Sequence, residues 1–414
     1  MKVSRMSWLV VTALVAGVST GSAGDWPNWR GPNRTDVSSE TGLLKKWPDG
    51  GPRRVWLNQS VGLGYSGVSV VGENLFTMGA RDDGEYVICL DASTGTEKWA
   101  SKLGTILDNG WGNGPRGTPT VYGDRVYAMG GTGGLVCLKI ADGSEVWRTG
   151  MTDLGGGRPN WGYCESVLVD GPRVVCTPGG KQGSIAALNK ENGEVLWRST
   201  ELTSGAQYAS IVPATIHGQA QYVQLFQDAV AGVSPADGKL LWKSSWPGKT
   251  AVIPTPIVAD DQVFITSGYG VGCSLIKIDG DNNVKEVYFN KNMKNHHGGV
   301  LLLDDHIYGH SDGVGWMCLD LQSGDVTWNE RGALGKGCVT YADGMLYCVD
   351  EGSGEVALVE ATTKRWNEVS RFKLTPQTTR RSPRGRIWTH PVVSNGKLYL
   401  RDQDLLFCYD VKSE

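Results

Sequence analysis

The chain has 414 residues, and its 40 lysines and arginines nearly balance 43 aspartates and glutamates, which leaves a formal net charge of −3. This balance argues against nucleic-acid binding, which needs a strongly basic face. Glycine (58 residues) and tryptophan (16 residues) are abundant, a combination typical of many short strands joined by tight turns, with large aromatic side chains between the sheets.

Residues 1–24 have the features of a secretory signal peptide. A positively charged start precedes an apolar stretch at 8–18, which is too short to span a bilayer, and small residues at 21–23 form a cleavage site. An uncleaved anchoring helix is the alternative. Because the first cysteine is Cys89, we expect no lipoprotein anchor at the cleavage site. No later stretch is apolar enough to span a membrane, so we expect an exported protein, periplasmic or secreted.

Residues 25–52 precede the repeats described below. They are rich in turn-forming residues and contain several tryptophans, among them Trp26 and Trp29. Disordered segments rarely carry so many aromatic side chains. We therefore expect an ordered N-terminal arm that packs its tryptophans on the rest of the molecule.

A six-residue phrase returns along the chain, in which a turn containing glycine precedes a short strand that ends in tryptophan. Copies lie at 94–99, 142–147, 192–197, 237–242 and 323–328. A period of roughly 40–50 residues is typical of repeat folds built from four-stranded units. The phrase therefore indicates a repeat protein rather than a chain of unrelated domains.

The repeats divide residues 53–414 into eight units. Each begins with an apolar run, continues through a turn into a second strand, and most end in the phrase; their bounds are 68–99, 118–147, 166–197, 210–242, 255–288, 299–328, 339–372 and 390–411. The eighth unit lacks its last strand, and the isolated phrase end at Trp56 can supply it. We predict an all-β fold, an eight-bladed β-propeller of four-stranded antiparallel blades, closed by pairing an N-terminal strand with the C-terminal blade. Such closure leaves no free sheet edge.

Nine cysteines in an exported chain raise the question of disulfides. Cys89, Cys137, Cys318 and Cys408 occupy the same point of separate repeats, where they would lie too far apart to form bridges. We expect these four to be small buried side chains. The odd number leaves at least one thiol free, and the pairing of the others stays open.

The repeats resemble the pyrroloquinoline-quinone-like (PQQ-like) repeat, whose pattern is Leu-Asp-x-x-Thr-Gly-x-x-x-Trp. The nearest copy is Leu90-Asp91-Ala92-Ser93-Thr94-Gly95-Thr96-Glu97-Lys98-Trp99. The resemblance implies the eight-bladed propeller. It also implies one of two functions, because the family includes quinoprotein alcohol dehydrogenases, which bind PQQ and calcium, and the outer-membrane protein-assembly propeller, which has no cofactor and no catalysis. This chain lacks the adjacent cysteine pair of the dehydrogenases, and no motif here matches their calcium ligands or catalytic aspartate. No cofactor is firmly implied, and PQQ with calcium stays an alternative.

In a propeller, the loops that lead into the innermost strands and those that join the second and third strands meet around the axis on one face. Polar and aromatic residues on such loops over a rigid scaffold are the default binding-site candidates. We expect this funnel to be formed by Tyr65, Trp111, Asn113, Arg116, Trp161, Tyr163, Glu165, Gln207, Asp228, Tyr269, His296, His297, His310, Asp312, Lys336, Trp388, His390, Arg401 and Asp402. Tyr208 and Arg386 lie on the same loops.

The funnel histidines have several interpretations. His296 and His297 can be metal ligands, a general base or loop hydrogen-bonding groups. Adjacent residues of an extended segment point opposite ways, so we expect at most one of the two to face the funnel. His390, His297 and Glu165 together can form a zinc-type site, although spacing cannot test ligands from different blades. The tryptophans can stack on a planar ligand or a sugar, or pack under their loops.

No catalytic motif accompanies the repeats. We therefore expect an exported binding scaffold, a monomer, that uses its funnel to bind an envelope protein, a peptide or a glycan. The alternative is a PQQ-dependent alcohol dehydrogenase-like oxidoreductase, and a third hypothesis is a metal-dependent hydrolase that uses the funnel histidines. Whether the protein is an enzyme stays open.

Overall fold

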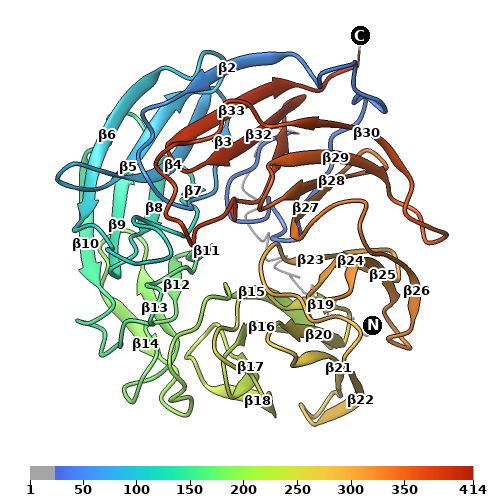
Figure 1. Ribbon diagram of the computed structural model, residues 1–414. Helices are drawn as coiled ribbons and strands as arrows, with labels where there is room; N and C mark the ends of the chain where they lie inside the picture. Colours follow the sequence, from blue (N-terminus) through green and yellow to red (C-terminus); the bar gives the residue numbers. More distant parts are fainter. Residues whose placement is uncertain (1–23, 414) are drawn as a thin grey trace, which may run out of the picture.

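The computed structural model describes residues 24–413, so the predicted signal peptide lies outside the described residues except for Gly24. Eight sheets, each with four antiparallel strands, stand in a ring around a central axis (Figure 1). The prediction of an all-β, eight-bladed β-propeller is confirmed. Within residues 24–413, no helix has the length and apolarity needed to cross a bilayer.

Each blade has four antiparallel strands that lie side by side in order from the axis to the rim (Figure 1). Blades 1 to 4 consist of β3 (Ser69–Val71), β4 (Asn74–Arg81), β5 (Gly84–Asp91) and β6 (Glu97–Gly104); of β7 (Thr120–Tyr122), β8 (Arg125–Met129), β9 (Gly134–Lys139) and β10 (Glu145–Gly150); of β11 (Leu168–Asp170), β12 (Arg173–Cys176), β13 (Ala186–Asn189) and β14 (Val195–Arg198); and of β15 (Val212–Ile216), β16 (Gln219–Leu225), β17 (Ala229–Val233) and β18 (Leu240–Ser245).

Blades 5 to 8 follow the same plan. They consist of β19 (Ile257–Ala259), β20 (Gln262–Ser267), β21 (Gly272–Ile278) and β22 (Val284–Asn290); of β23 (Val300–Leu303), β24 (His306–Ser311), β25 (Gly315–Asp320) and β26 (Val326–Glu330); of β27 (Gly337–Ala342), β28 (Met345–Asp350), β29 (Glu355–Glu360) and β30 (Glu368–Lys373); and of β31 (Val392–Ser394), β32 (Lys397–Asp402), β33 (Leu405–Asp410) and β2 (Arg54–Asn58).

The ring closes through strands from the two ends of the repeat region. β2 pairs antiparallel with β33, with Trp56 opposite Cys408 and Leu57 opposite Phe407. The predicted closure is therefore confirmed. The eighth blade thus contains strands from both ends of the repeat region, and this pairing closes the ring.

The core lies between neighbouring blades, and the alternation within each strand explains how. In β8, Val126 and Ala128 pack with blade 1, whereas Tyr127 and Met129 pack with blade 3. Successive side chains of a strand point to opposite faces of the sheet. A middle strand of a blade is therefore mostly apolar, because both of its faces are buried.

The tryptophan of the repeated phrase links five blades to the next one by a hydrogen bond, whereas Trp242 of blade 4 donates to Gln221 of its own blade. Trp147 of β10 donates a hydrogen bond from Nε1 to the Lys190 carbonyl of blade 3 at 2.8 Å, and its ring lies so close to Gly193 that a Cβ there would be 2.8 Å from it. Trp56 makes the equivalent bond to the Ala92 carbonyl of blade 1 at 3.0 Å, so the same contact links the last blade to the first. The phrase thus combines glycine and tryptophan because one packs on the other across the blade boundary.

Residues 24–52 lie on the propeller and add to it. β1 (Val37–Ser38) pairs parallel with β27 and gives blade 7 a fifth strand. Trp26 forms an antiparallel bridge with Val70, and Trp47 packs edge-on against Phe372, with ring centroids 5.1 Å apart. The fifth strand was not predicted, because two residues show no periodicity that a sequence pattern can detect.

All nine cysteines are free thiols in this structure. Cys89, Cys137, Cys318 and Cys408 are fully buried among apolar side chains of their blades. Their common position in the repeat therefore reflects packing in the space between blades.

Candidate functional site

The N-terminal arm spans the axis and is held there by buried arginines. Arg34 donates hydrogen bonds to the carbonyls of Ser166 and Val167, which precede β11, and Arg30 donates to the carbonyl of Val300 in β23. The arm is thus tied to blades 3 and 6. Burial lowers the pKa of Arg34 to about 10, a shift that the nearby charge of Glu165 opposes.

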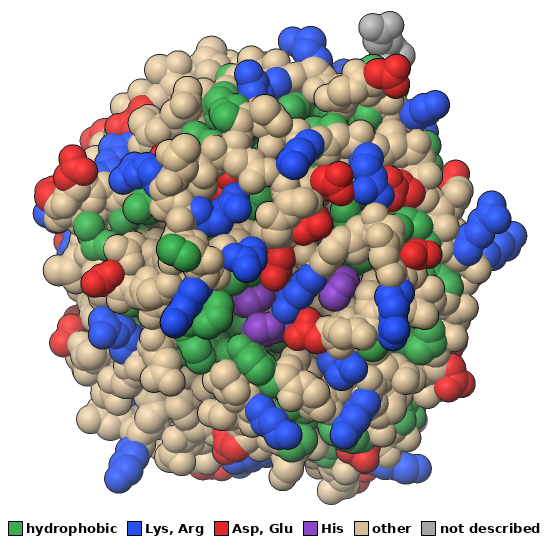
Figure 2. All heavy atoms as spheres, in the orientation of Figure 1, with side chains coloured by type: hydrophobic (Ala, Val, Ile, Leu, Met, Phe, Trp, Pro, Cys, Tyr) green, Lys and Arg blue, Asp and Glu red, His purple; other side chains and the backbone are tan. Residues whose placement is uncertain are grey.

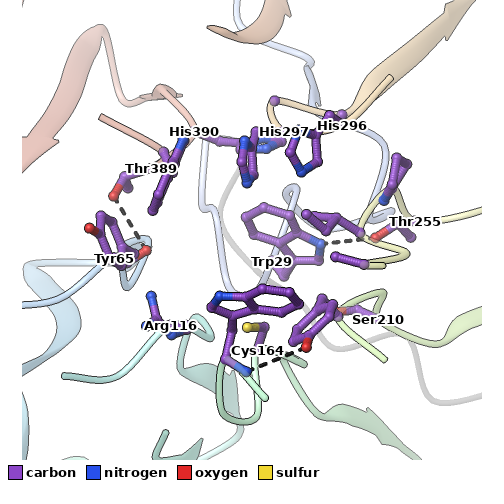
Figure 3. A pocket seen from close by; sticks show the side chains of 18 of the residues that line it. Trp29, Tyr65, Arg116, Cys164, Ser210, Thr255, His296, His297, Thr389 and His390 are labelled. Carbon is purple, nitrogen blue, oxygen red and sulfur yellow. Dashed lines mark hydrogen bonds between the residues drawn. The ribbon is translucent and has the colours of Figure 1, made fainter. Parts of the chain in front are cut away.

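Arg30 also forms an ion pair with Asp36, with Nε and Oδ2 2.6 Å apart, and both side chains are buried. The same Asp36 Oδ2 lies 3.1 Å from Nδ1 of His390. Next to Arg30 in the sequence, Trp29 donates a hydrogen bond to Thr255 Oγ1 at 3.3 Å and packs against His390 with ring centroids 4.5 Å apart. In Figure 3 the Trp29 ring lies below His296, His297 and His390.

Above the arm lies a cavity of about 180 Å³. Its walls come from the arm and from the connections around the ring, except the one between blades 6 and 7. The lining residues are Trp29, Arg30, Tyr65, Trp111, Arg116, Trp161, Cys164, Ser166, Tyr208, Ser210, Ala251, Ile253, Pro254, Thr255, Tyr269, His296, His297, Gly298, Gly299, Trp388, Thr389 and His390. Histidines lie at the centre of this face, next to hydrophobic side chains and surrounded by lysines and arginines (Figure 2).

Nine of the predicted funnel residues share this cavity, and they carry most of its aromatic and basic groups. They are Tyr65, Trp111, Arg116, Trp161, Tyr269, His296, His297, Trp388 and His390. Tyr208, on the same loops, lines it as well. The structure thus brings together residues from connections that are distant in the sequence.

Aromatic rings form a continuous wall along one side of the cavity. Tyr269 contacts His296 edge-on at 4.4 Å, His296 stacks on His297 at 3.9 Å, and His297 stacks on Trp388 at 4.6 Å. Trp388 then contacts Tyr65 at 4.8 Å. Such a wall offers flat faces to a ring or to an apolar side chain.

The expectation that only one of the two adjacent histidines faces the funnel is wrong, because both line the cavity. The segment is not an extended strand. Gly298 and Gly299 follow with φ values of 87° and 64°, and the Asn295 amide donates hydrogen bonds to the carbonyls of Gly299 (2.9 Å) and His310 (3.0 Å). This tight loop turns both imidazoles to the same side.

Hydrogen bonding determines the proton position on His296. Lys336 Nζ lies 2.8 Å from His296 Nδ1 and 2.9 Å from Asp312 Oδ1. Because an ammonium group only donates, Nδ1 accepts and the ring proton belongs on Nε2. Burial, with the charges of His297 and Lys336, lowers the pKa of His296 to about 2. His296 is thus a neutral hydrogen-bond donor. Lys336 fixes the orientation of its ring through Nδ1, and Asp312 holds Lys336 in place.

The second imidazole is also neutral. His297 Nδ1 lies 3.6 Å from Glu351 Oε2, and burial, followed by the charge of Lys336, lowers the pKa of His297 to about 3. Glu351 in turn accepts a hydrogen bond from Trp388 Nε1 at 3.0 Å, while burial raises the pKa of its own carboxyl group. Glu351 therefore orients the tryptophan of the aromatic wall.

Several predicted residues have structural contacts outside the cavity. Arg401 is buried and donates hydrogen bonds to the carbonyls of Gly62, Ser66, Met78 and Gln403 and to Thr77 Oγ1, so it ties blade 8 to blade 1. Burial lowers the pKa of Arg401 to about 9.

Three further buried residues also point away from the cavity. Asp402 pairs with Arg381, with Oδ2 and Nη2 2.6 Å apart. Glu165 accepts hydrogen bonds from the backbone and hydroxyl groups of Thr177, and burial raises its pKa to about 7. Tyr163 donates to the Pro178 carbonyl at 3.1 Å.

The remaining predicted residues lie on loops or at strand ends. Asn113 accepts a hydrogen bond from the Asn109 backbone, and Gln207 accepts one from that of Val252. Asp228 lies 3.8 Å from Lys243 near the outer strand of blade 4. His310 of β24 packs edge-on against Trp316 at 5.6 Å, and burial lowers its pKa to about 4.

Sequence reasoning missed the contributions of the arm and of the connection between blades 4 and 5. Trp29, Arg30, Cys164 and the apolar residues Ala251, Ile253 and Pro254 line the cavity. The aromatic content of residues 25–52 was the available signal for Trp29. Apolar loop residues such as Ile253 gave none, because an apolar side chain on a loop does not distinguish a cavity wall from ordinary packing.

The carboxylates around the cavity are too few, and too fully engaged in other bonds, to coordinate a calcium ion. Calcium takes six to eight oxygen ligands, usually including several carboxylates. None of the lining residues is acidic, and the nearest carboxylates, Asp36, Asp312 and Glu351, already bond to Arg30, Lys336 and Trp388. Among residues 24–413, no three His, Cys, Asp or Glu side chains gather as metal ligands. The suggested grouping of His390, His297 and Glu165 is not formed, since Glu165 is turned to Thr177.

A family model described as outer membrane protein assembly factor BamB matches residues 82–330. The outer membrane protein assembly factor BamB of Kangiella koreensis is 24% identical over 211 residues, which are 51% of this chain and 48% of that protein. This match thus spans about half the length of the relative.

Two solved structures share the propeller. BamB from Moraxella catarrhalis superposes with a TM-score of 0.61 at 14% identity, covering 87% of this chain and 99% of that one. Quinohemoprotein alcohol dehydrogenase from Comamonas testosteroni superposes with a TM-score of 0.62 at 12% identity, covering 95% and 81%. At such identities the likeness shows the fold and does not extend to function.

Proposed function

This chain belongs to the family described as outer membrane protein assembly factor BamB, and we propose that it is an exported binding scaffold that holds a protein partner of the cell envelope at its axial cavity. Its relative from Kangiella koreensis is named as an assembly factor for outer membrane proteins. A role in assembling other envelope proteins is the natural extension to this chain.

The observation that carries the proposal is the aromatic cavity at the centre of one face. Rings from Tyr65, Trp111, Trp161 and Trp388 lie on separate connections, and the blades hold them in fixed positions. Aromatic side chains are the residues most enriched in the energetic centres of protein interfaces. A rigid set of flat apolar faces can receive one or two side chains of a partner segment.

The polar groups of the cavity are arranged for binding. The His296 and His297 pKa values of about 2 and 3 lie far below the range in which imidazole exchanges protons at neutral pH. Lys336 occupies one nitrogen of His296. These imidazoles can orient a ligand by hydrogen bonding, and acid–base catalysis by them is disfavoured.

The proposal is tested by photo-crosslinking in the cell envelope. Trp111, which is 40% exposed, is replaced by p-benzoylphenylalanine, and Leu196 on β14, which is 47% exposed on the outer rim, is replaced likewise as a matched control. We expect a defined protein adduct from position 111 that is missing from position 196. The same adducts at both positions, or no adduct at position 111, would contradict the proposal.

A PQQ-dependent oxidoreductase is the second candidate, supported by the aromatic cavity on the axis of a propeller. The lining residues could contact a planar ring, but the acidic groups do not fit the calcium ion. Titration of the purified protein with PQQ, with and without calcium, separates the two candidates through tryptophan fluorescence. Tight calcium-dependent binding would favour the oxidoreductase, and the absence of binding would remove this candidate.

A further inference from the structure

Arg116 is partly buried, and its side chain donates fewer hydrogen bonds than those of the fully buried Arg34 and Arg401. Arg116 Nη2 donates a hydrogen bond to the Gly112 carbonyl at 2.9 Å, and its guanidinium lies over the Tyr65 ring, 5.1 Å from the centroid. Its Nε is buried without a hydrogen-bond partner among residues 24–413, and no carboxylate of that region forms an ion pair with it. The Nε atoms of Arg30, Arg34 and Arg125 share this lack of a hydrogen-bond partner within the same residues. Arg116 differs from them because its guanidinium lines the cavity without an ion-pair partner in that region, and an unpaired buried donor is costly.

The cavity around this guanidinium carries a net positive charge. None of the lining residues is Asp or Glu, and the charge of Arg30 is matched by Asp36. The charge of Arg116 counteracts the effect of burial on the pKa values of neighbouring groups. Burial raises the pKa of the Cys164 thiol to about 11, and Arg116 opposes that rise. Burial also raises the pKa of Tyr65, again opposed by Arg116. Arg116 also opposes the rise that burial causes in the pKa of Glu85, so this carboxylate feels its charge. An anion entering the cavity would still meet a partly buried guanidinium that forms no ion pair with a carboxylate of residues 24–413.

The volume of the cavity limits the size of the uncharged part of such an anion. An apolar cavity of about 150 Å³ holds one benzene ring, and this cavity measures about 180 Å³. The wall formed by His297, Trp388 and Tyr65 presents flat faces to a ring. Figure 3 shows Arg116 between Tyr65 and Cys164, at the edge of the same cavity. The space thus suits one aromatic ring with a small charged substituent.

We propose that the axial cavity binds a carboxylate attached to a single aromatic ring, with the carboxylate held by the Arg116 guanidinium and the ring packed on the aromatic wall. This inference rests on the proposed function, because it names the chemistry of the group that the cavity receives. The group can belong to a free aromatic acid or to a partner segment in which an aromatic residue stands next to an acidic one.

The first test compares ligands that differ only in charge. Phenylacetate and its neutral analogue phenylacetamide are titrated into the purified full-length protein by calorimetry. We expect phenylacetate to bind about tenfold or more tightly, the range for a charge-assisted hydrogen bond, and its affinity to fall as salt is added. Equal affinities, or no binding of either ligand up to about 10 mM, would overturn the proposal. This comparison needs no variant and therefore does not depend on the folding of one.

Variants then test whether Arg116 supplies the positive charge that binds the carboxylate. Arg116→Gln should abolish the preference for phenylacetate, Arg116→Lys should keep part of it, and Arg365→Gln, at an exposed position on the outer side of blade 7, should leave it unchanged. A preference that survives in a folded Arg116→Gln protein would overturn the proposal.

The source of the carboxylate is tested with end-blocked Phe-Asp and Phe-Asn dipeptides. Preference for Phe-Asp indicates a partner segment, and preference for phenylacetate alone indicates a free acid. If no ligand shows a charge preference while the crosslink from position 111 persists, the scaffold function stands and this inference fails.

Discussion

His296 and His297 are neighbours in the sequence, and their rings also stack on each other, with centroids 3.9 Å apart and planes inclined by 26°. Consecutive side chains in a strand cannot do this, because they point to opposite faces. The stack places His296, a neutral donor held by Lys336, next to His297, whose ring stacks in turn on Trp388. The polar and aromatic parts of the cavity are therefore one rigid unit.

Gly298 makes this stack possible. Its φ is 87° and a Cβ there would lie 1.9 Å from the Gly337 carbonyl oxygen. Gly298→Ala should therefore lower the free energy of unfolding by about 3 kcal/mol or more. Gly313→Ala is the matched control, because Gly313 has a φ of 74° with no atom within 4 Å of the added Cβ, and only the backbone term of about 1 kcal/mol should appear. Equal losses in urea denaturation would contradict this account.

His310 should make the protein sensitive to mild acid. Its pKa is about 4 in the folded state against an ordinary value of 6.5, so the unfolded chain binds the proton first and stability falls as pH drops from about 6.5 towards 4. At about pH 5 the loss from this one group is about 2 kcal/mol. His310→Phe should lose correspondingly less stability between about pH 7.5 and about pH 5 in urea denaturation. A variant with the acid sensitivity of the natural protein would refute the assignment.

Arg401 is expected to be essential for folding rather than for ligand binding. Replacement by Met leaves the carbonyls of Gly62, Ser66 and Met78 without their donor in a buried place. The expected loss is about 3–5 kcal/mol, measured by chemical denaturation. Arg365→Gln, at an exposed position, should stay within about 0.5 kcal/mol of the natural protein. A fully stable Arg401→Met protein that has lost ligand binding would instead restore Arg401 to the site.

Trp56 should be a stabilising contact of the ring closure. Trp56→Phe removes the hydrogen bond to the Ala92 carbonyl and keeps much of the packing. It should lower the free energy of unfolding by about 1 kcal/mol. Trp56→Ala also leaves a cavity over Gly95, and it should lower the free energy of unfolding by about 3–5 kcal/mol. The exposed change Val195→Ala, at 44% exposure, is the control. Thermal unfolding that ranks the variants differently would argue against the blade-to-blade contact.

The thiols should react slowly in the native protein. Burial raises the pKa of Cys164 to about 11 and that of Cys89 to about 12. At about pH 8 the thiolate fraction of Cys164 is then about one in a thousand, against about a quarter for a free thiol. Titration with Ellman's reagent should detect almost no fast thiol before denaturant is added and nine afterwards. A rapid stoichiometric reaction in the folded state would show that Cys164 is more open than its burial indicates.

The blades and their closure followed from the sequence because the signals are local. Alternating apolar residues define each strand, and the contact between Trp147 and Gly193 recurs between Trp56 and Gly95, between Trp99 and Gly143, and between Trp197 and Gly238. The position of Trp56 before the first blade and the missing strand after the last required the ring to close by β2 and β33. These features repeat, so that each copy supports the interpretation of the others.

The site was decided only by the tertiary structure. Tyr65, Arg116, His296 and Trp388 come from connections that are far apart in the chain, and loops have no period that tells which side chains turn to the axis. Arg401 could not be distinguished from Arg116 by sequence, although one is enclosed by backbone carbonyls and the other faces the cavity. The path of the arm, which brings Trp29 to the cavity, depends on buried bonds of Arg30 and Arg34 to blades 6 and 3. Strand patterns are encoded within a few residues, whereas convergence at the axis depends on how all eight blades pack together.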